Sequence, residues 1–567
     1  MKKILYIAGA LFISAGIFTS CERDISLLNI DPKHPEVVPS KNLVVTSERY
    51  LADFWVTPSV NLNISRFFTQ QWTETQYIDE TNYNFITRNQ PQNHFNTMYR
   101  DVLGPLKQAK KFLDMEAESA TLSTATAAKV KTNKKAIIEM LSIYAWLNLV
   151  DTFGNVPYSE ALQNEVGATV LQPKYDDAAA IYADLETRLD AVVASMDPSL
   201  PGYGEDAFYK GDMSKWKLLA NSVKLRMGLN LSDVNPAKGK QLVESAYAAG
   251  VILDKSNDFV FSYVNGLVSN PVYQNLVQSG RNDFIPSDVY VNALKAKSDP
   301  RRFSFFAENR NKDLGTVETV TPPVSPATLT TIVFEEDLAN TPTVGQAVFK
   351  NNTASEPENN PEDDFLIGYV AAVTTNSITL VKNSEVVAPG DVLNFENYVG
   401  GPYGNLAAFN NFTHVTGKIK QPDYPGYLLE SVEVKFMLAE AAARGYNVGG
   451  TAATWYDAAV TASMKQWGVD PADTATYLAA NPYDAANWKK SIGMQAWFAM
   501  FNRGIEAWYF FRRLDYPQLT VPGNAEGLVY RITYSNNEYS TNSANVTAAA
   551  SAIGGDKYTT KVFWDKF

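Results

Sequence analysis

The sequence predicts a mainly α-helical fold, and two observations support this prediction. Apolar residues recur at helical spacing through most of the chain, with polar or glycine-bearing connectors between the runs. Within residues 141–162, the first half is apolar nearly all round, which is typical of a helix buried among other helices. Gly154 is expected to close this helix in a left-handed conformation, and Pro157 prevents the helix from resuming.

The same periodicity locates the other helices. Helical runs occupy residues 99–115, 134–150, 175–196, 215–232, 236–249, 286–297, 431–445, 455–467 and 488–513. Residues 73–83 and 270–284 show no sustained period and are expected to be loops. The sequence therefore predicts a large helical scaffold that carries irregular loops.

Residues 316–397 interrupt the helical pattern, because Thr, Pro, Val and acidic residues dominate there. Phe365–Val373 and Ser377–Val381 read as two short strands joined by a turn. The acidic run at residues 356–364 lacks the alternating spacing of a calcium loop, so a solvated loop is expected. We predict a small β-rich insertion between two helical halves.

The composition argues against several classes of function. The chain has 567 residues, of which 45% are hydrophobic, and this is enough for a large core. Its net charge is −12 and no basic patch of nucleic-acid-binding size occurs, so no nucleic-acid partner is expected. The three histidines are far apart in the sequence, and no histidine-based metal site is expected.

Motifs of common catalytic sites are missing from the sequence. It contains no GxxxxGK[ST] phosphate loop, no HExxH zinc motif, no GxSxG elbow and no CxxC pair. We therefore predict a protein that is not an enzyme, with no catalytic residues, no metal and no cofactor. A glycoside hydrolase stays open as an alternative, because its two carboxylates have no fixed spacing in sequence.

The N-terminus predicts export and a lipid anchor. Lys2 and Lys3 precede an apolar run at residues 4–18, which reads as a secretory signal peptide over residues 1–20. Cys21 is the only cysteine, and its place after small residues resembles the bacterial lipobox, where the thiol is acylated. The proline-containing residues 21–41 then read as a tether leading to the folded part.

Five motifs occur in the order known from one protein family. They are DTFGNVPY at residues 151–158, WKLLANSVKLR at 216–226, DPR at 299–301, LAEAAARG at 438–445 and GIEAWYFFRRLDYPQL at 504–519. Together they resemble the SusD/RagB family of outer-membrane lipoproteins. Arg512 and Arg513 of the last motif lie at a helix end, where a structural ion pair is the favoured reading.

The resemblance implies a fold and a function. It implies tetratricopeptide-like helix pairs in a single SusD-like domain over residues 42–567, with the 316–397 insertion inside it. It also implies a lipid-anchored protein on the outer surface of the outer membrane. Such a protein captures a glycan or an oligopeptide and delivers it to a TonB-dependent, SusC-like transporter. A lipid-anchored glycoside hydrolase and a structural or adhesive surface protein are the alternatives.

Aromatic residues in the irregular loops are the candidate ligand contacts. Aromatic faces bind the C–H surfaces of sugars and the side chains of peptides, while amides and arginines orient the ligand. The candidates are Trp72, Tyr77, Asn82 and Tyr83 in one loop, and Tyr273, Asn275, Arg281 and Phe284 in another. For Trp72 the alternative is a place in the core.

Overall fold

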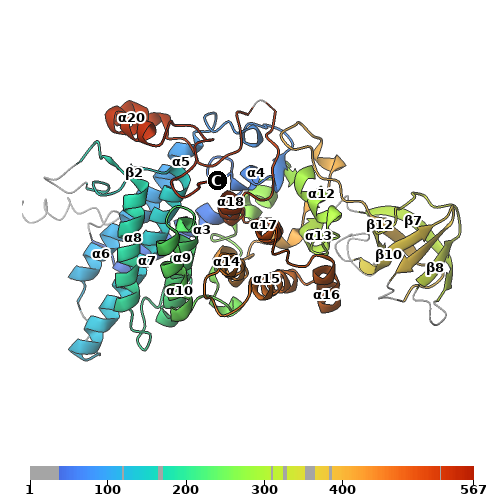
Figure 1. Ribbon diagram of the computed structural model, residues 1–567, viewed down its shortest axis with the longest axis horizontal. Coiled ribbons are helices and arrows are strands. Elements are labelled where there is room, and N and C mark those ends of the chain that lie inside the picture. Colours follow the sequence, from blue (N-terminus) through green and yellow to red (C-terminus); the bar gives the residue numbers. More distant parts are fainter. Residues whose placement is uncertain are drawn as a thin grey trace, which may run out of the picture.

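The computed structural model describes residues 37–117, 121–163, 170–307, 311–322, 329–351, 364–381, 386–523 and 525–567. Cys21, the predicted signal peptide and most of the predicted tether lie outside the described residues, as does most of the acidic run at 356–364. The fold is mainly α-helical, as the sequence predicts (Figure 1).

Helices from the first half of the chain pack as pairs on one side of the molecule (Figure 1). They are α3 (Ser40–Val56), α6 (Gly104–Met115), α7 (Thr124–Phe153), α8 (Ala178–Ser195), α9 (Met213–Leu231) and α10 (Pro236–Ala249). Helix α3 packs on α6, α7 on α8, and α9 on α10. Because each pair covers a face of its neighbour, the group forms the tetratricopeptide-like scaffold that the resemblance implies.

Helices from the last third of the chain form a second group. They are α14 (Ser431–Ala443), α15 (Ala452–Gln466), α16 (Pro471–Ala480), α17 (Trp488–Ala499), α18 (Gly504–Leu514), α19 (Asn536–Thr541) and α20 (Ser543–Ala552). Helix α14 packs on α15, on α17 and on α9, so it joins the two groups.

The prediction of one continuous helix over residues 488–513 is wrong. The chain leaves the helix after Ala499, takes a positive φ of 63° at Asn502 and starts α18 at Gly504. A Cβ at Gly504 would lie 2.4 Å from the backbone nitrogen of Arg66, so this glycine lets α18 approach the short helix α4 (Ser65–Phe68) closely. The break is a consequence of that tertiary contact.

Four short antiparallel strand pairs tie together loops that are distant in sequence. They are β1 (Trp72–Glu74) with β5 (Phe284–Pro286), β2 (Val156–Pro157) with β3 (Tyr175–Asp176), β4 (Phe259–Phe261) with β14 (Gly426–Leu429), and β6 (Phe306–Ala307) with β13 (His414–Val415). Short helical segments connect them: η1 (Glu80–Asn82), α5 (Gln90–Asn96), η2 (Thr97–Leu103), η3 (Lys255–Asn257), α11 (Pro271–Tyr273), η4 (Gln274–Gln278), α12 (Asp288–Ala296), α13 (Arg302–Phe305), η6 (Phe409–Asn411) and η7 (Gly417–Lys420).

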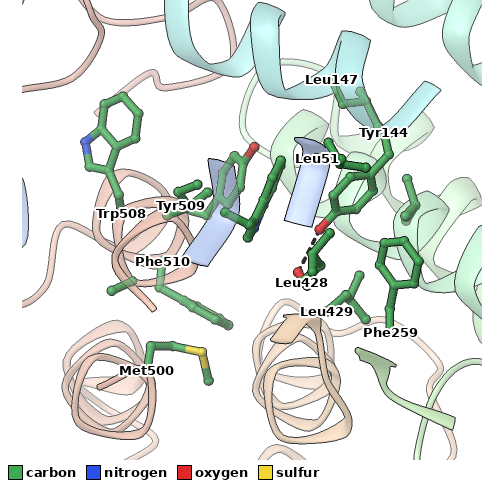
Figure 2. Packing of buried hydrophobic residues seen from close by; sticks show 14 of the residues in the cluster. Leu51, Tyr144, Leu147, Phe259, Leu428, Leu429, Met500, Trp508, Tyr509 and Phe510 are labelled. Carbon is green, nitrogen blue, oxygen red and sulfur yellow. Dashed lines mark hydrogen bonds between the residues drawn. The ribbon is translucent and has the colours of Figure 1, made fainter. Parts of the chain in front are cut away.

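Helix α7 lies at the centre of the core. Among the described residues it is the one helix long and apolar enough to cross a membrane, but 94% of its most apolar stretch is buried inside the fold. Figure 2 shows Tyr144 of this helix packed beside Leu51 and Phe259, with its hydroxyl donating to the Leu428 carbonyl oxygen at 2.7 Å. The polar end of a buried tyrosine is thereby satisfied, and α7 is a core helix.

Gly154 ends α7 with a positive φ, as predicted, although not in the left-handed helical region itself. Its φ is 82° and its ψ is −120°, and its amide donates to the Val150 carbonyl oxygen at 2.9 Å. Residues with a Cβ are strongly disfavoured in this conformation. The chain then turns at once into β2 (Val156–Pro157).

The β-rich segment is a closed six-stranded barrel with the strand order β10-β11-β8-β7-β12-β9. Its strands are β7 (Asn311–Thr321), β8 (Leu329–Phe334), β9 (Ala347–Lys350), β10 (Phe365–Val373), β11 (Ser377–Val381) and β12 (Val392–Glu396). The two predicted strands are confirmed, but the barrel begins at Asn311, before the predicted boundary. Leu314, Ile332 and Ile367 belong to its separate hydrophobic core. The barrel projects at the end of the molecule opposite α6–α10 (Figure 1).

A buried ion pair attaches the barrel to the helical scaffold. Arg302 of α13 donates from Nε and Nη2 to the two carboxylate oxygens of Glu396, at 2.7 and 2.8 Å. Both side chains are almost fully buried. Such a two-bond contact fixes direction as well as distance, so it sets how β12 leaves the scaffold.

Candidate functional site

The two loops chosen from the sequence lie side by side, because β1 pairs with β5. Glu74 lies opposite Phe284 in this pair. The contact continues beyond the strands, where Thr75 donates its amide to the Asp283 carbonyl oxygen and its hydroxyl to that of Asn282, both at 2.7 Å. Residues on both sides of this junction therefore belong to one surface.

Three of the predicted ligand residues lie in the core. Trp72 is 0% exposed, and Tyr83 and Phe284 are each 3% exposed. The prediction that these rings offer a face to a ligand is wrong, and the core alternative for Trp72 is correct. The reason is tertiary: β1 is covered on both sides, and the Arg66 guanidinium lies 5.3 Å from the Trp72 ring centre.

Tyr77 is the predicted aromatic residue that does reach solvent. Its side chain is 65% exposed, and its positive φ of 56° turns the chain sharply at that point. The guanidinium of Arg88 lies 5.9 Å from its ring centre, and Arg88 Nε in turn lies 2.8 Å from Glu80 Oε1. An exposed ring is thereby connected to a buried carboxylate.

Asn82 is half-buried and joins this loop to another part of the chain. Its Nδ2 donates to the carbonyl oxygens of Ile78 and Gly404, both at 2.9 Å. The amide nitrogen is therefore used in the fold, and the amide oxygen points toward the backbone of Gly404 and Gly523. The structure gives Asn82 a role in holding loops together.

The second predicted loop is partly exposed. Tyr273 and Asn275 are half-buried on α11 and η4, and Asn275 Nδ2 donates to the Pro271 carbonyl oxygen at 2.8 Å. Arg281 is half-exposed, and its Nε lies 2.9 Å from Asp283 Oδ2. The strand pairing thus brings Arg281 and Tyr77 to the same end of β1 and β5.

Sequence reasoning missed a third loop at this surface. Ala407 donates its amide to the Thr75 carbonyl oxygen at 3.0 Å, and the neighbouring Leu406 is 70% exposed. Ile86, which follows the first predicted loop, and Val277, on the second, are exposed as well. We call the surface formed by Tyr77, Arg281 and Leu406 the loop face, because the contacts of Thr75 with Asp283 and Ala407 join their three segments. No local pattern marks Leu406, since only the fold brings residues 399–413 here.

A pair of buried carboxyl groups lies beneath the loop face. Glu74 Oε2 accepts hydrogen bonds from the amide and hydroxyl of Thr81 at 3.1 and 3.0 Å, and Glu74 also hydrogen-bonds Glu80. Burial and the contact with Glu80 raise the pKa of Glu74 to about 9. Burial also raises the pKa of Glu80. Two like charges so close cannot both persist, so the pair shares a proton near neutral pH.

The described residues contain no group of three or more His, Cys, Asp or Glu side chains that could hold a metal ion. The loop face itself presents an aromatic ring, an aliphatic side chain and a guanidinium on loops held by a short sheet.

Residues of three of the sequence motifs contact one another in the core and not at the loop face. Asp151 accepts hydrogen bonds from Tyr182 at 2.6 Å and from Trp564 Nε1 at 2.7 Å. Arg513 forms the expected ion pair, with Glu440 at 3.0 Å. Arg512 forms no ion pair with a described residue; its guanidinium lies 3.6 Å from the Trp508 ring centre and donates to the Asp151 carbonyl oxygen. The motif side chains named here thus stabilise the scaffold.

Comparison with known families agrees with this distribution of motifs. Residues 32–321 and 336–535 match the model of the SusD-like family, which is described as starch-binding and associating with the outer membrane. The chain belongs to the SusD-like family. A comparison with curated proteins found no match.

Solved structures of SusD-like proteins share the fold at low identity. A chitin-binding protein is 22% identical with a TM-score of 0.66, and the match covers 93% of this chain and 100% of that one. A SusD-like protein from Bacteroides thetaiotaomicron is 19% identical, with a TM-score of 0.64 and coverage of 93% and 99%. A chitin-binding SusD homologue from Flavobacterium johnsoniae is 21% identical, with a TM-score of 0.61 and coverage of 93% and 97%.

Proposed function

We propose that this SusD-like protein binds a glycan or an oligopeptide at the loop face and delivers it to a TonB-dependent, SusC-like transporter in the outer membrane. The observation that carries the proposal is the exposed ring of Tyr77, which Arg88 holds at the junction of three loops. A ring presented in this way offers a flat apolar surface at a low entropy cost. Arg281, at the same end of the sheet, supplies a donor for a hydroxyl or carbonyl oxygen.

A glycan is the favoured ligand of the two. The family description names starch, and two of the structurally similar proteins are named as chitin-binding. The two glutamates nearest to Tyr77 in the sequence, Glu74 and Glu80, are both buried and so are not presented to a ligand. We therefore propose capture without cleavage.

Binding would be tested by isothermal titration calorimetry with chitohexaose, maltohexaose and a mixed pool of oligopeptides. Tyr77→Ala is expected to abolish binding of the ligand that the wild-type protein takes. Incubation of the same protein with the polysaccharide should release no product. Product formation would support the hydrolase alternative, and unchanged binding by Tyr77→Ala would contradict the loop face as the site.

The anchor and the partner are proposed from the sequence. Cys21 would carry the lipid and the protein would lie on the cell surface, where it would cover a larger outer-membrane barrel. Cys21→Ala should move the protein from the membrane pellet into soluble fractions. Purification from native membranes in mild detergent should recover the barrel with the protein, and recovery of the protein alone would argue against the partnership.

A further inference from the structure

A concave surface lies on elements that take no part in the loop face. It is a cleft of about 260 Å³. Its walls come from α5 and η2, from residues shortly after β2 and shortly before β3, and from α19. Asn542 donates its Nδ2 to the Pro173 carbonyl oxygen at 2.8 Å, so α19 and the segment before β3 are held together. Figure 1 shows α5, β2 and α20 near one another in this part of the molecule. This hydrogen bond thus holds two walls of the cleft together.

The lining of this cleft has two kinds of surface. Pro157, Leu162 and Leu171 give it an apolar side from one stretch of chain, and Asn96 and Thr541 give it polar groups from α5 and α19. Tyr99 also lines it, and its hydroxyl donates to the Pro157 carbonyl oxygen at 2.7 Å. The ring of this half-buried tyrosine packs against Phe95 and Trp146, so it forms part of the apolar wall of the cleft.

The charged groups at the cleft make contacts within the fold. Arg100 donates to both carboxylate oxygens of Asp101, at 2.7 and 2.9 Å. Glu538 accepts a hydrogen bond from the Tyr175 hydroxyl at 2.8 Å. The positive charge of Arg100 is therefore compensated, and the carboxylate of Glu538 does not favour an anionic ligand.

The amides leave bonding capacity for a neutral ligand. Asn96 Oδ1 accepts from Gln92 Nε2 at 2.8 Å, whereas Asn96 Nδ2 donates to no described residue. The Thr541 hydroxyl donates to the Asn537 carbonyl oxygen at 2.8 Å and keeps only its capacity to accept. One free amide donor and one hydroxyl acceptor beside proline and leucine suit a molecule with an apolar face and a rim of hydroxyl groups. A sugar ring has this character.

We propose that the cleft is a second binding site, for a neutral sugar unit of the glycan that the loop face binds. The inference rests on the proposed function, and it predicts that a longer glycan makes contacts at the cleft as well as at the loop face. An oligosaccharide held at two sites binds more tightly than either site alone would hold it.

The test uses chitohexaose and maltohexaose as probes in calorimetric titrations of the full chain. Thr541→Trp fills the cleft from an exposed position, and Asn96→Ala removes the free amide donor. Each is expected to weaken binding about tenfold, the effect of losing roughly one hydrogen bond with its stacking contact. Thr547→Trp makes the same change at an exposed position on α20 outside the cleft and should bind like the wild type. Melting temperatures verify that each variant is folded.

The outcomes separate this inference from the proposed function. If both cleft variants bind the hexasaccharides like the wild type while Tyr77→Ala does not bind, the cleft is not a sugar site and the loop face stands. If the cleft variants lose binding while Tyr77→Ala keeps it, the cleft is supported as a sugar site and the loop face is contradicted as one. If neither sugar binds and an oligopeptide does, with loss in Tyr77→Ala, the sugar inference is overturned and capture at the loop face remains.

Discussion

The guanidinium of Arg88 lies 5.9 Å from the centre of the Tyr77 ring, while its Nε lies 2.8 Å from the buried carboxylate of Glu80. One arginine therefore connects a ring that is open to solvent with the interior of the fold. A cation over an aromatic face contributes about 0.5–1 kcal/mol at an exposed site. Arg88 thus acts as a positioning residue, which limits the orientations that Tyr77 takes before a ligand arrives.

Replacing Arg88 by methionine keeps an unbranched side chain of about the length of the arginine stem and removes the guanidinium with its charge. Ligand affinity should fall about two- to fivefold, because the Tyr77 ring would be free to reorient before binding. Titration calorimetry with the ligand found for the wild-type protein measures this. Arg49→Met removes a comparable half-buried ion pair, with Asp53 on α3, and should leave affinity unchanged. Equal loss in both variants would contradict a local role for Arg88.

Trp72 and Tyr77 are only five positions apart but should respond to truncation in opposite ways. Trp72→Ala should cost about 3–5 kcal/mol of unfolding free energy, because it leaves a cavity where a fully buried ring packs. Tyr77→Ala should leave the melting temperature nearly unchanged and remove ligand binding. Thermal unfolding together with calorimetric titration of both variants provides the check. A stable Trp72→Ala variant would contradict its place in the core.

The Glu74–Glu80 pair should make stability depend on pH. The pKa of Glu74 is raised to about 9 in the folded protein, so the folded state keeps a proton that the unfolded chain releases above about pH 4. The stability that this proton contributes is fully present below about pH 4 and is lost as the pH rises through about 9. Glu74→Gln fixes the neutral form, and the fall in melting temperature between pH 5 and pH 9 should shrink by about 2–4 °C. Glu526→Gln, at an exposed position, is the control and should follow the wild-type profile.

Gly154 and Gly204 provide a matched test of backbone strain. Gly154→Val places a β-branched residue at φ 82°, and a Cβ there meets nothing closer than 3.9 Å, so the cost is conformational and about 1–3 kcal/mol. Gly204 has no positive φ and no neighbour within 4 Å of a Cβ, so Gly204→Val should be nearly neutral. Melting temperatures of the two variants test whether only Gly154→Val is destabilised. The ligand affinity of the folded protein should not change in either variant. Equal melting temperatures would remove the helix-closing role of Gly154.

Much of the fold was predictable because its signals are local. Helix α10 matches its prediction to the residue, since Asn235 caps its start, Pro236 opens it and Gly250 follows its end with a positive φ. The break at Asn502 was not predictable, because Gly504 must approach the backbone of Arg66, which lies far away in sequence. Likewise β10 and β11 follow from their alternation, whereas closure of the barrel depends on β7 pairing with β12.

The candidate site, like the fold, was predictable only in part from the sequence. The lack of period located both stretches but not their short regular elements: the ends of the predicted loops form β1 and β5, and residues 271–278 form α11 and η4. The pairing of Glu74 with Phe284 brings the two stretches together. The sequence could not distinguish the buried Trp72 from the exposed Tyr77, because burial of β1 comes from packing with Arg66 and Phe284. Nor could the sequence place Leu406 at the site. Its neighbour Ala407 donates a backbone hydrogen bond to the Thr75 carbonyl oxygen, and this contact brings Leu406 there.

The attachment of the barrel rests on Arg302 and Glu396, and this pair should show the energetics of a buried ion pair. Glu396→Ala leaves the Arg302 guanidinium buried without its carboxylate and should cost about 3–5 kcal/mol. Arg302→Met combined with Glu396→Leu replaces both charges by apolar groups of similar size, and most of the lost stability should return. Calorimetric melting of the single and double variants measures the difference. Glu526→Ala breaks an exposed pair with Lys557 and should change stability by less than about 1 kcal/mol. A double variant no more stable than Glu396→Ala would show that the charges themselves, and not the space they fill, hold the barrel to the scaffold.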